Sequence, residues 1–540
     1  MAIKRYSATA DTTISNAFKE NLTTRGTGSN MGRADSLEVF SIYGQATTGS
    51  AELSRILIQF PTSEIGTDRI TGVIPQSGNV SFYLKMFNAP TPFTVPRDFN
   101  LTVHAISQST IAGAWTGFDS WQEGQGIDMD NYTDVTRDGR GANWLRIGSS
   151  SAGGAVSWRY PGGDFHTDTS SSFTVAFEDG TEDLEVDITE LAEQWLQAEG
   201  ASTPDGNLGQ KKNYGVIVKL SGSFEAYTST ADSSTTVPAN MTGSFRSYYT
   251  KKFFARSSEF FFKRPVLEAR WDSSTKDNRA NFFYSSSLAT AEENMQTLFL
   301  YNYFRGQLRN IPNLTDQKVY VSFRSGSLDN SQPTGSELKL VRDAVHVVDT
   351  SAFYVTGGVT TTAGIYTASV ALTSAKQPLT RVFDIWSSEA GGTEYHTGTI
   401  DPIVLELQPQ NDSTRYVSKI TNLKPIYAAN ETVRFRVFTR QKDWDPNIYT
   451  RAISTVTPLI IDSGSYAVER IVDGFNAIPF GTGSDMHTQM SFDVSGSYFD
   501  LDMSMLEPGY SYKIKFSYYN GSVAAWREQP ETFRFRVEES

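Results

Sequence analysis

Residues 432–438, with the sequence Thr-Val-Arg-Phe-Arg-Val-Phe, place apolar and charged side chains at alternating positions. Successive side chains of a β-strand point to opposite faces of a sheet, so this alternation predicts a strand with one buried and one exposed face. Residues 532–538, Thr-Phe-Arg-Phe-Arg-Val-Glu, repeat the pattern near the end of the chain. We interpret the two runs as two strands of one sandwich, although an internal repeat would give the same pattern.

The arginines of both runs are expected to project outward and to form a basic strip on one sheet face. Such a strip is either a solvated surface or an interface for an acidic neighbour. Between the runs, residues 509–516 form a predicted penultimate strand that pairs with the last one. The arginines concerned are Arg434, Arg436, Arg534 and Arg536.

The rest of the chain has a similar composition. Short runs of Val, Ile, Thr, Tyr and Phe are separated by Gly, Asn, Asp and Pro, and aromatic residues make up 13% of the sequence. This composition predicts an all-β protein with short strands and many turns. A chain of 540 residues is too long for one hydrophobic core, so three or four domains are expected.

The spacing of the strand runs suggests where the domains divide. Residues 1–272 are expected to form a jelly-roll-like sandwich, and the polar residues 273–296 a linker. Residues 297–410 and 411–540 each carry strand runs at the spacing of an immunoglobulin-like sandwich.

One short helix is predicted within the first domain. Asp187 is a candidate N-cap, and Glu190 follows three residues later, which is the spacing of a capping box. The apolar positions that follow fall on one face of a helix. They are Ile188, Leu191, Ala192 and Trp195.

Charge and cysteine content narrow the classes of partner. The chain contains no cysteine, so it has no disulfides or thiolate metal sites, and this fits assembly in a reducing cytoplasm. Its net charge of −13 opposes binding to a phosphate backbone, so no nucleic-acid partner is expected. No run approaches the length of a membrane span and the start lacks the apolar region of a signal peptide, so no membrane partner is expected.

The sequence lacks the common motifs of catalysis and metal binding. It has no nucleophile elbow and no phosphate-binding loop. The histidines lie far apart, and no pair has metal-ligand spacing. We therefore expect no enzyme, no cofactor and no bound metal. The histidines are His104, His166, His346, His396 and His487.

Two segments of the chain are rich in carboxylates that could bind a metal or act on a substrate. Asp128, Asp130 and Asp134 resemble the start of a calcium loop, but the sequence lacks the glycine and the final glutamate of that motif, so a solvated loop is expected. Residues 179–193 contain carboxylates that could act in pairs on a glycoside. Helix capping already accounts for two of them, so a glycosidase is the weaker interpretation.

Two tryptophans are candidates for stacking on a sugar. Trp144 and Trp158 flank a stretch rich in Gly and Ser. An exposed aromatic ring can stack on a sugar while its polar edge stays wet. The alternative for both rings is packing at the rim of the sandwich.

An ordered series of short motifs runs through the first half of the chain. In this order the motifs resemble the DNRLRE-type β-sandwich module of bacterial surface proteins, polysaccharide-binding proteins and phage structural proteins. The resemblance implies a jelly-roll-like sandwich that holds and binds and is not generally a catalyst. The motifs are residues 10–14, 54–60, 121–124, 161–165, 186–195, 213–219, 254–259 and 264–270.

Four longer strings, residues 21–32, 247–256, 268–272 and 506–510, resemble virion proteins of marine tailed phages, especially myoviruses of cyanobacteria. This resemblance implies a component of the neck, tail, baseplate or capsid surface. The partners would be other virion structural proteins, in an arrangement that includes copies of this chain. The location would be the virion, assembled in the host cytoplasm.

Three hypotheses of function follow. The first is a non-enzymatic structural protein of a tailed-phage virion that docks through sandwich edges and loops. The second is a carbohydrate-binding adhesin or fibre protein that recognises a host surface glycan. The third, a polysaccharide-degrading enzyme, has the least support in the residues.

Overall fold

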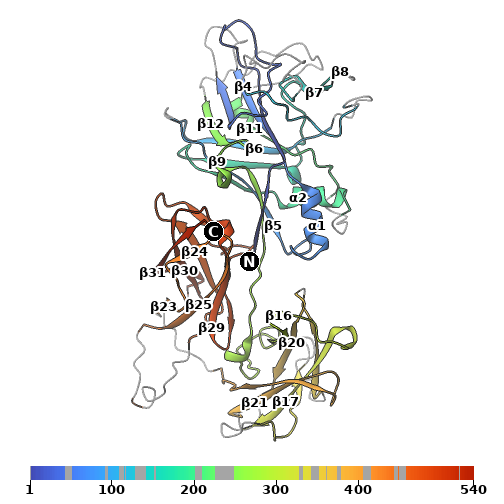
Figure 1. The fold of residues 1–540 in the computed structure, drawn as a ribbon, viewed down its shortest axis with the longest axis vertical. Helices are drawn as coiled ribbons and strands as arrows, with labels where there is room; N and C mark the ends of the chain where they lie inside the picture. The colour runs from blue at the N-terminus through green and yellow to red at the C-terminus, as the bar shows by residue number, and fades with distance from the viewer. Residues whose placement is uncertain are drawn as a thin grey trace. The chain divides into compact units, whose positions relative to one another are not determined.

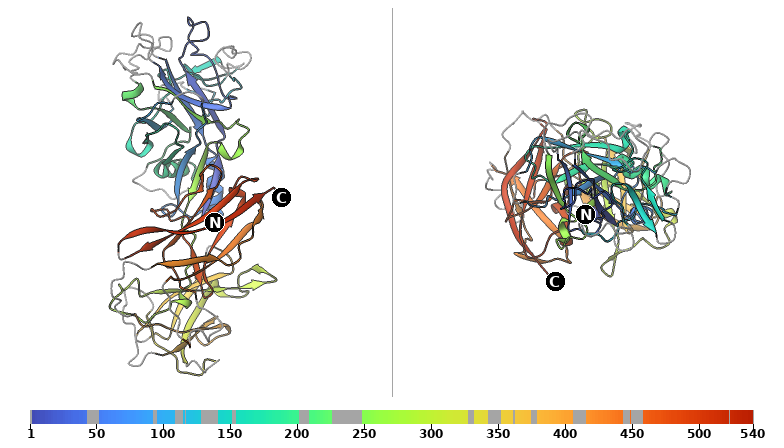
Figure 2. Two further views of the ribbon diagram at one scale, coloured as in Figure 1. Left: turned by 90° about the vertical axis from the view of Figure 1, so that its left-hand side faces the viewer. Right: turned by 90° about the horizontal axis from the view of Figure 1, so that it is seen from above.

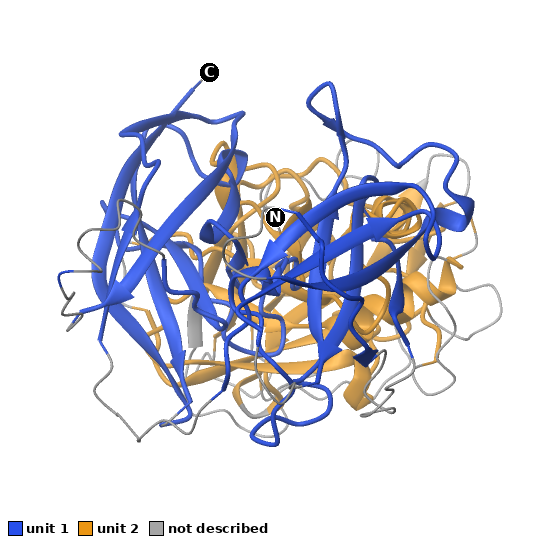
Figure 3. Ribbon diagram, turned by 90° about the horizontal axis from the view of Figure 1, so that it is seen from below, with its two compact units in different colours: residues 1, 272–540 blue, residues 2–271 orange. Residues whose placement is uncertain are grey.

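The computed structural model divides the chain into two compact units, which Figure 3 colours separately. Unit 2 comprises Ala2–Trp271, and unit 1 comprises Met1 and Asp272–Ser540. Both consist mainly of antiparallel sheets with few helices, so the prediction of an all-β protein built from sandwiches is confirmed. The structure describes residues 2–539 except 43–51, 92–94, 109–114, 116, 128–140, 151–153, 201–208, 226–247, 327–331, 342–351, 361, 374–378, 406–414, 443–447, 449–457 and 522.

Unit 2 contains a smaller and a larger sheet (Figure 1). The smaller sheet has the order β1 (Ile3–Ser7), β13 (Val266–Arg270), β5 (Ser81–Met86) and β10 (Leu184–Asp187). The larger sheet has the order β12 (Tyr248–Phe254), β3 (Ser36–Ile42), β4 (Glu52–Gln59), β11 (Val216–Leu220), β6 (Phe99–Ala105) and β9 (Ser172–Phe177), and β2 (Ala10–Ser15) also pairs with β4. A small hairpin joins β7 (Arg146–Ser150) to β8 (Gly154–Ser157).

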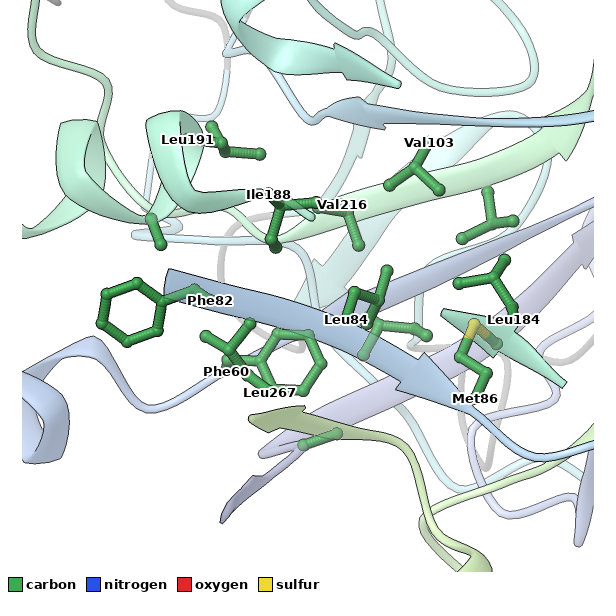
Figure 4. Packing of buried hydrophobic residues seen from close by; sticks show 14 of the residues in the cluster. Phe60, Phe82, Leu84, Met86, Val103, Leu184, Ile188, Leu191, Val216 and Leu267 are labelled. Carbon is green, nitrogen blue, oxygen red and sulfur yellow. The ribbon is translucent and has the colours of Figure 1, made fainter. Parts of the chain in front are cut away.

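The core of unit 2 lies between these two sheets. Alternate residues of each strand point inward, and Figure 4 shows Leu84 of the smaller sheet among Val103 and Val216 of the larger one. The opposite face of the larger sheet carries a second apolar cluster that includes Leu57 and Ile217. Strands β4 and β11 are therefore buried on both faces, which explains the consecutive apolar residues 56–58 and 216–218.

The predicted helix is α2 (Thr189–Ala198), and its predicted apolar face is buried against the core. The N-cap position is Ile188 rather than Asp187, although the Asp187 carboxylate accepts a hydrogen bond from the Thr189 backbone N–H at 2.9 Å. A second helix, α1 (Thr62–Ile70), was not predicted.

Helix α1 escapes sequence analysis because its buried face is largely polar. Arg69 of α1 forms two hydrogen bonds of 2.6 Å with the Glu193 carboxylate of α2, and both side chains are buried. A pattern of apolar residues therefore does not mark this helix. A further helical turn, α3 (Gly222–Glu225), follows β11.

Seven strands in the first part of unit 1 hydrogen-bond into one continuous sheet. The order is β14 (Gln296–Tyr301), β20 (Ile365–Leu372), β19 (Tyr354–Val359), β17 (Lys318–Gly326), β21 (Arg381–Ser387) and β22 (Glu394–Ile400), and β18 (Leu340–Val341) pairs with β20. Inward residues of these strands share one apolar cluster. The remaining short helical turns of the chain are Thr169–Ser171, Phe261–Lys263, Asn278–Ala280, Thr315–Gln317 and Met503–Met505.

Residues 273–296, for which the sequence suggests a linker, contribute to this same cluster. Phe282 and Tyr284 are buried within it. Arg279 donates hydrogen bonds to Asp277 and to Asp384 of β21, both at 2.7 Å. The charged residues of this segment pair with one another and with the sheet. A polar composition therefore does not mean that the segment lies outside the core.

The second part of unit 1 is a sandwich of two sheets (Figure 2). One has the order β23 (Tyr416–Ile420), β25 (Thr432–Gln441), β29 (Gly496–Asp502) and β28 (Ser491–Asp493). The other has the order β24 (Ile426–Ala428), β31 (Ala525–Glu538), β30 (Ser511–Asn520), β26 (Gly464–Arg470) and β27 (Asn476–Ile478). In chain order, the first sheet is the A-B-E-D sheet of an immunoglobulin domain, and the second contains its G-F-C strands.

Aromatic rings occupy the centre of this cysteine-free sandwich. Tyr466 of β26 stacks on Phe499 of β29 with ring centroids 4.1 Å apart, and Phe516 of β30 lies 6.0 Å from Phe499. Ring pairs of this kind stabilise a core beyond the area that they bury. They connect the two sheets across the core of a sandwich that has no disulfide.

Tyr512, near the start of β30, forms the hydrogen bond that defines a tyrosine corner. Its hydroxyl donates to the Glu507 carbonyl, five residues earlier, at 2.8 Å, and its ring is buried. We expect Tyr512→Phe to lower the free energy of unfolding by about 1 kcal/mol, because the carbonyl loses its partner. Urea titration of the full chain measures this loss, and Tyr519→Phe, on an exposed ring of the same strand, should leave the midpoint unchanged.

Candidate functional site

The charged residues of the motif series meet in buried groups within unit 2. Two of the groups join motifs that lie far apart in the sequence, and the third joins one motif to residues of three other strands. Three such groups account for most of the series, and their geometry decides whether the motifs mark a reactive site or a structural one.

The first group forms around Arg55, a charged residue within the apolar strand β4. Arg55 binds both carboxylate oxygens of Glu225, at 2.7 and 2.9 Å, and donates to the Gly162 carbonyl at 2.7 Å. The Lys219 ammonium of β11 lies 2.9 Å from the same carboxylate. Motifs 54–60 and 213–219 therefore meet at one buried carboxylate, and Arg55 connects motif 161–165 to the same group.

The electrostatics of this group favour the charged form of Glu225. Burial alone would raise the pKa of Glu225, but the charges of Arg55 and Lys219 outweigh it, so the pKa is lowered. Burial and the nearby cation Lys219 lower the pKa of His104 to about 4. The His104 Nδ1 lies 3.1 Å from the His166 carbonyl, so this nitrogen carries the proton of a neutral ring. A histidine with this pKa stays neutral across the physiological range and is a poor general base there.

The second group joins motifs 10–14, 121–124 and 254–259. The Asp11 backbone N–H donates to Glu123 at 3.0 Å, and the Asp11 carboxylate accepts from the Arg256 backbone N–H at 2.6 Å. The Arg256 guanidinium binds both oxygens of Glu123, at 3.0 and 2.6 Å. Glu123 is thus a clamp between two chain segments.

Asn30 completes this group from a separate loop. Its side-chain amide donates to the carbonyls of Glu123 and Ala142, at 2.7 and 2.9 Å. Its side-chain oxygen accepts from the N–H groups of Gly126 and Gly32, at 2.9 and 3.3 Å. All the hydrogen-bonding positions of the amide are in use, so the loop is held to the motif through one side chain.

Burial raises the pKa of Asp11 to about 7, with Glu123 adding to the effect and the Arg256 contacts opposing it. The folded state then binds a proton that the unfolded state releases near pH 4, so this group's contribution to stability is complete below pH 4 and declines as the pH rises to about 7. Asp11→Asn keeps an oxygen acceptor and removes the titration.

We expect the free energy of unfolding of the wild type, relative to Asp11→Asn, to fall by at least about 1 kcal/mol between pH 4 and pH 7. Denaturant titrations of both proteins at a series of pH values measure the difference, which cancels the contributions of other groups such as His104. A difference that is constant with pH would show that Asp11 ionises normally in the folded state.

The third group surrounds Glu268 of β13, in motif 264–270. Arg5 and Arg270 each donate to its carboxylate at 2.7 Å, and the Lys85 ammonium lies 4.0 Å away. The carboxylate is fully buried. Burial alone would raise its pKa, but the cations Lys85, Arg5 and Arg270 hold the pKa of Glu268 far below its usual value. Glu185 offsets part of the remaining positive charge, 2.8 Å from Arg270 and 3.2 Å from Lys85.

The predicted sugar platform is wrong. Trp144 and Trp158 are both buried in the second apolar cluster of unit 2. The Arg55 guanidinium lies 5.1 Å from the Trp144 ring, and Trp115 packs edge-on against Trp158 at 5.7 Å. Their rings are covered by their own unit, so neither has a face free for a sugar.

The predicted basic strip on one sheet face is also wrong. Arg434 and Arg436 lie on β25 and Arg534 and Arg536 on β31, which belong to different sheets. The rings of Phe435 and Phe535, next to these arginines, face one another across the core at 6.3 Å. The arginines therefore point outward on opposite faces of the sandwich.

On one of these faces the positive charge is neutralised by carboxylates of the same sheet. Arg434 binds both oxygens of Asp500, at 2.8 and 2.9 Å, and Arg436 binds Asp493 at 2.7 Å. Cross-strand pairs of opposite charge stabilise a sheet modestly. The arginines of β25 thus stabilise their own sheet, and they leave no basic strip on this face for an acidic neighbour.

The acidic residues 179–193 are engaged in structural contacts rather than paired for catalysis. Glu193 and Glu185 form the ion pairs described above, and the Glu182 carboxylate accepts the backbone N–H groups of residues 178 and 179. Asp128, Asp130 and Asp134 lie outside the described residues. Among the described residues no cluster of three or more metal-ligating side chains occurs, and the helices found there are too short or too polar to cross a bilayer.

Sequence reasoning missed the partners of the motif residues. Arg55 within an apolar run and Glu268 within residues 264–270 could have been noticed as charges in predicted core strands. A buried charge requires a partner of opposite sign, so their presence predicts ion pairs without naming the partners. Glu225 lies in the helical turn α3 and Asn30 in a loop, and no sequence signal connects them to the strands they hold.

No family model matches the chain, and no curated protein matches it. Among solved structures, the N-terminal Ig1-2 module of the Drosophila receptor protein tyrosine phosphatase DLAR is similar with 8% sequence identity. The alignment covers 41% of this chain and 92% of that one, with a TM-score of 0.12. A TM-score this low carries no information about function.

Proposed function

We propose that this chain is a non-enzymatic structural protein of a tailed-phage virion. In this role it docks to other virion proteins, including copies of itself, through sandwich edges and loops. The resemblance of its motifs and longer strings to virion proteins suggests the setting. The use of the motif residues inside unit 2 is the observation that carries the proposal.

Those residues form the skeleton of a sandwich. Glu225 and Glu268 are buried and each has more than one cationic partner, and the buried Arg55 binds Glu225, so these three side chains are unavailable to a substrate. A catalytic acid or base must reach the proton that it transfers, and a nucleophile must reach the reacting atom. Because the charged residues of the motif series form internal ion pairs, they support a binding or structural role instead.

The architecture suits attachment to neighbours. Sandwich domains leave strand edges and end loops at the surface, where a second protein can add a strand or insert a loop. Stable assemblies need large buried areas and well-packed anchors rather than a reactive side chain. Virions assembled in the host cytoplasm use such contacts, and the absence of cysteine is compatible with that compartment.

Purified virus particles provide the test. We expect mass spectrometry of gradient-purified particles to find the chain in a fixed ratio to the major capsid protein, and cryo-electron microscopy to place density for its sandwiches at the neck, tail, baseplate or capsid surface. Absence of the chain from particles, while it is abundant in the infected-cell lysate, would contradict the proposal. Turnover of a host polysaccharide by the purified chain would contradict it as well.

The alternative is a carbohydrate-binding adhesin or fibre protein. Its candidate sugar-binding residues, Trp144 and Trp158, are buried and cannot stack on a glycan. A glycan array with the full chain distinguishes the two. Saturable binding to one host glycan would favour the adhesin. Binding to no glycan, together with a fixed copy number in particles, would favour the structural role.

A further inference from the structure

A small hairpin in unit 1 exposes two aromatic side chains at its tip. Strand β15 (Tyr303–Phe304) pairs with β16 (Gln307–Leu308) through a two-residue turn. The turn residues Arg305 and Gly306 have φ values of 52° and 78°, as a type I′ turn requires. Tyr303 and Phe304 are 59% and 52% exposed.

The base of the hairpin is braced, so the tip is held in place. The Asn302 backbone N–H donates to the Gly364 carbonyl at 2.8 Å, and its side-chain amide donates to the Arg309 carbonyl at 2.7 Å. The Gly364 N–H donates to the Asn310 side chain at 2.7 Å. A rigid element loses little conformational entropy when it binds a partner.

Two cations accompany the exposed ring of Phe304. The guanidinium carbons of Arg305 and Arg309 lie 5.3 and 5.7 Å from its ring centroid. Within the part of the chain that the structure describes, neither guanidinium forms an ion pair. The tip is thus an aromatic and cationic surface on a chain of net charge −13.

The stability of the hairpin does not explain why Tyr303, Phe304 and Arg305 occupy its tip. Asn or Gly fits the first turn position at little cost, whereas another residue with positive φ costs about 1 kcal/mol. Strands of two residues contribute little to a sheet, and exposed Phe and Tyr on them lower solubility. The residue types instead match those that dominate binding energy in protein interfaces, which are rich in Tyr, Phe and Arg.

We propose that this hairpin is a docking element that binds an acidic surface of a second copy of this chain. The argument for a second copy is charge complementarity, because 60 acidic against 47 basic side chains leave the rest of the molecule strongly negative. The contact is heterologous, with the hairpin of one copy on a different surface of the next, so repetition builds a ring or a filament. The inference concerns self-association and does not depend on the virion role.

Sedimentation velocity of the full chain over a wide concentration range tests the inference. We expect the weight-average sedimentation coefficient to rise with concentration. The double substitution of Phe304→Ser with Arg309→Ser should weaken association by at least about tenfold, the effect of losing one interface anchor. Higher salt should weaken the wild type, because the attraction is electrostatic.

Two further variants separate docking from folding. Arg305→Asn keeps a residue suited to the turn and removes one cation, so it should weaken association without lowering stability. Phe261→Ser removes a ring that is 61% exposed in unit 2 and should leave association unchanged. A photoreactive phenylalanine analogue at position 304 should cross-link to an acidic peptide of the other copy.

A chain that stays monomeric at every concentration would overturn the inference, even if it bound a glycan array or anionic vesicles. Association that survives the double substitution would overturn it too. So would equal weakening by Phe261→Ser, because that result would indicate general hydrophobic association rather than a specific contact.

Discussion

Replacing Glu268 by Gln should lower the free energy of unfolding of unit 2 by about 3 to 5 kcal/mol. The substitution keeps the shape of the side chain and removes its charge, so Arg5, Arg270 and Lys85 lose their shared buried counter-ion. Glu185 is half exposed and cannot compensate three cations by itself. Breaking a buried ion pair from one side costs more than the pair contributes, because the remaining charges stay buried.

Urea titration monitored by tryptophan fluorescence measures the effect, since unit 2 contains most of the buried tryptophans described. Glu190→Gln, on the exposed side of α2, is the matched control and should change stability by less than about 0.5 kcal/mol. The lowered pKa of Glu268 adds a second expectation. Its contribution should be complete above the usual glutamate pKa of 4.5 and should decline as the pH falls below it, and the variant should lack this decline.

A loss below about 1 kcal/mol for Glu268→Gln would show that water reaches the cluster and screens it. The motif 264–270 would then have no role in holding the sheets, and the structural interpretation of the motif series would lose its strongest member.

Gly215→Ala should destabilise unit 2 by about 3 kcal/mol or more, the sum of backbone strain and overpacking. Gly215 precedes the central strand β11 and has a φ of 83°. A Cβ atom there would lie 2.0 Å from the Ile58 carbonyl oxygen of the neighbouring strand β4. A backbone atom within a sheet cannot move aside as a flexible side chain can, so β11 must shift relative to β4 or β6.

Gly200→Ala is the control for the strain term. Gly200 follows α2 with a φ of 73°, and a Cβ atom there meets no other atom within 4 Å. Its substitution should cost only about 1 to 2 kcal/mol, the penalty of a left-handed conformation. Thermal unfolding of both variants separates the two terms, and equal losses would mean that the close approach to Ile58 is relieved without cost.

Much of the fold could be predicted because it follows from local patterns. Residues 432–438 and 532–538 alternate, and both are strands, β25 and β31. The predicted pairing of residues 509–516 with the last strand is confirmed by the register of β30 and β31. Helix α2 was recognised because its apolar residues recur at the helical period, whereas α1 was missed because an ion pair replaces its apolar face.

Local patterns did not predict which side chains are exposed at the surface of a unit, nor which sheet each strand joins. Trp144 and Trp158 were expected at a rim and lie in a core, because loops from distant parts of unit 2 cover the outer face of the larger sheet. The arginines of β25 and β31 were expected on one face and lie on two. A strand pattern indicates which side chains point away from the core but not which sheet the strand joins.

The amino-acid sequence by itself determined the class of this protein: alternation, turn residues and aromatic content specify short strands that must bury one face, and the lack of cysteine means that no disulfide holds them together. Only the tertiary structure decided what the charged motif residues do. Arg55, Glu123 and Glu268 find their partners across more than a hundred residues of chain. A charged residue within a predicted core strand indicates that a counter-ion must be present. Which residue supplies it depends on the order of the strands and the path of the loops, and no local sequence pattern contains that information.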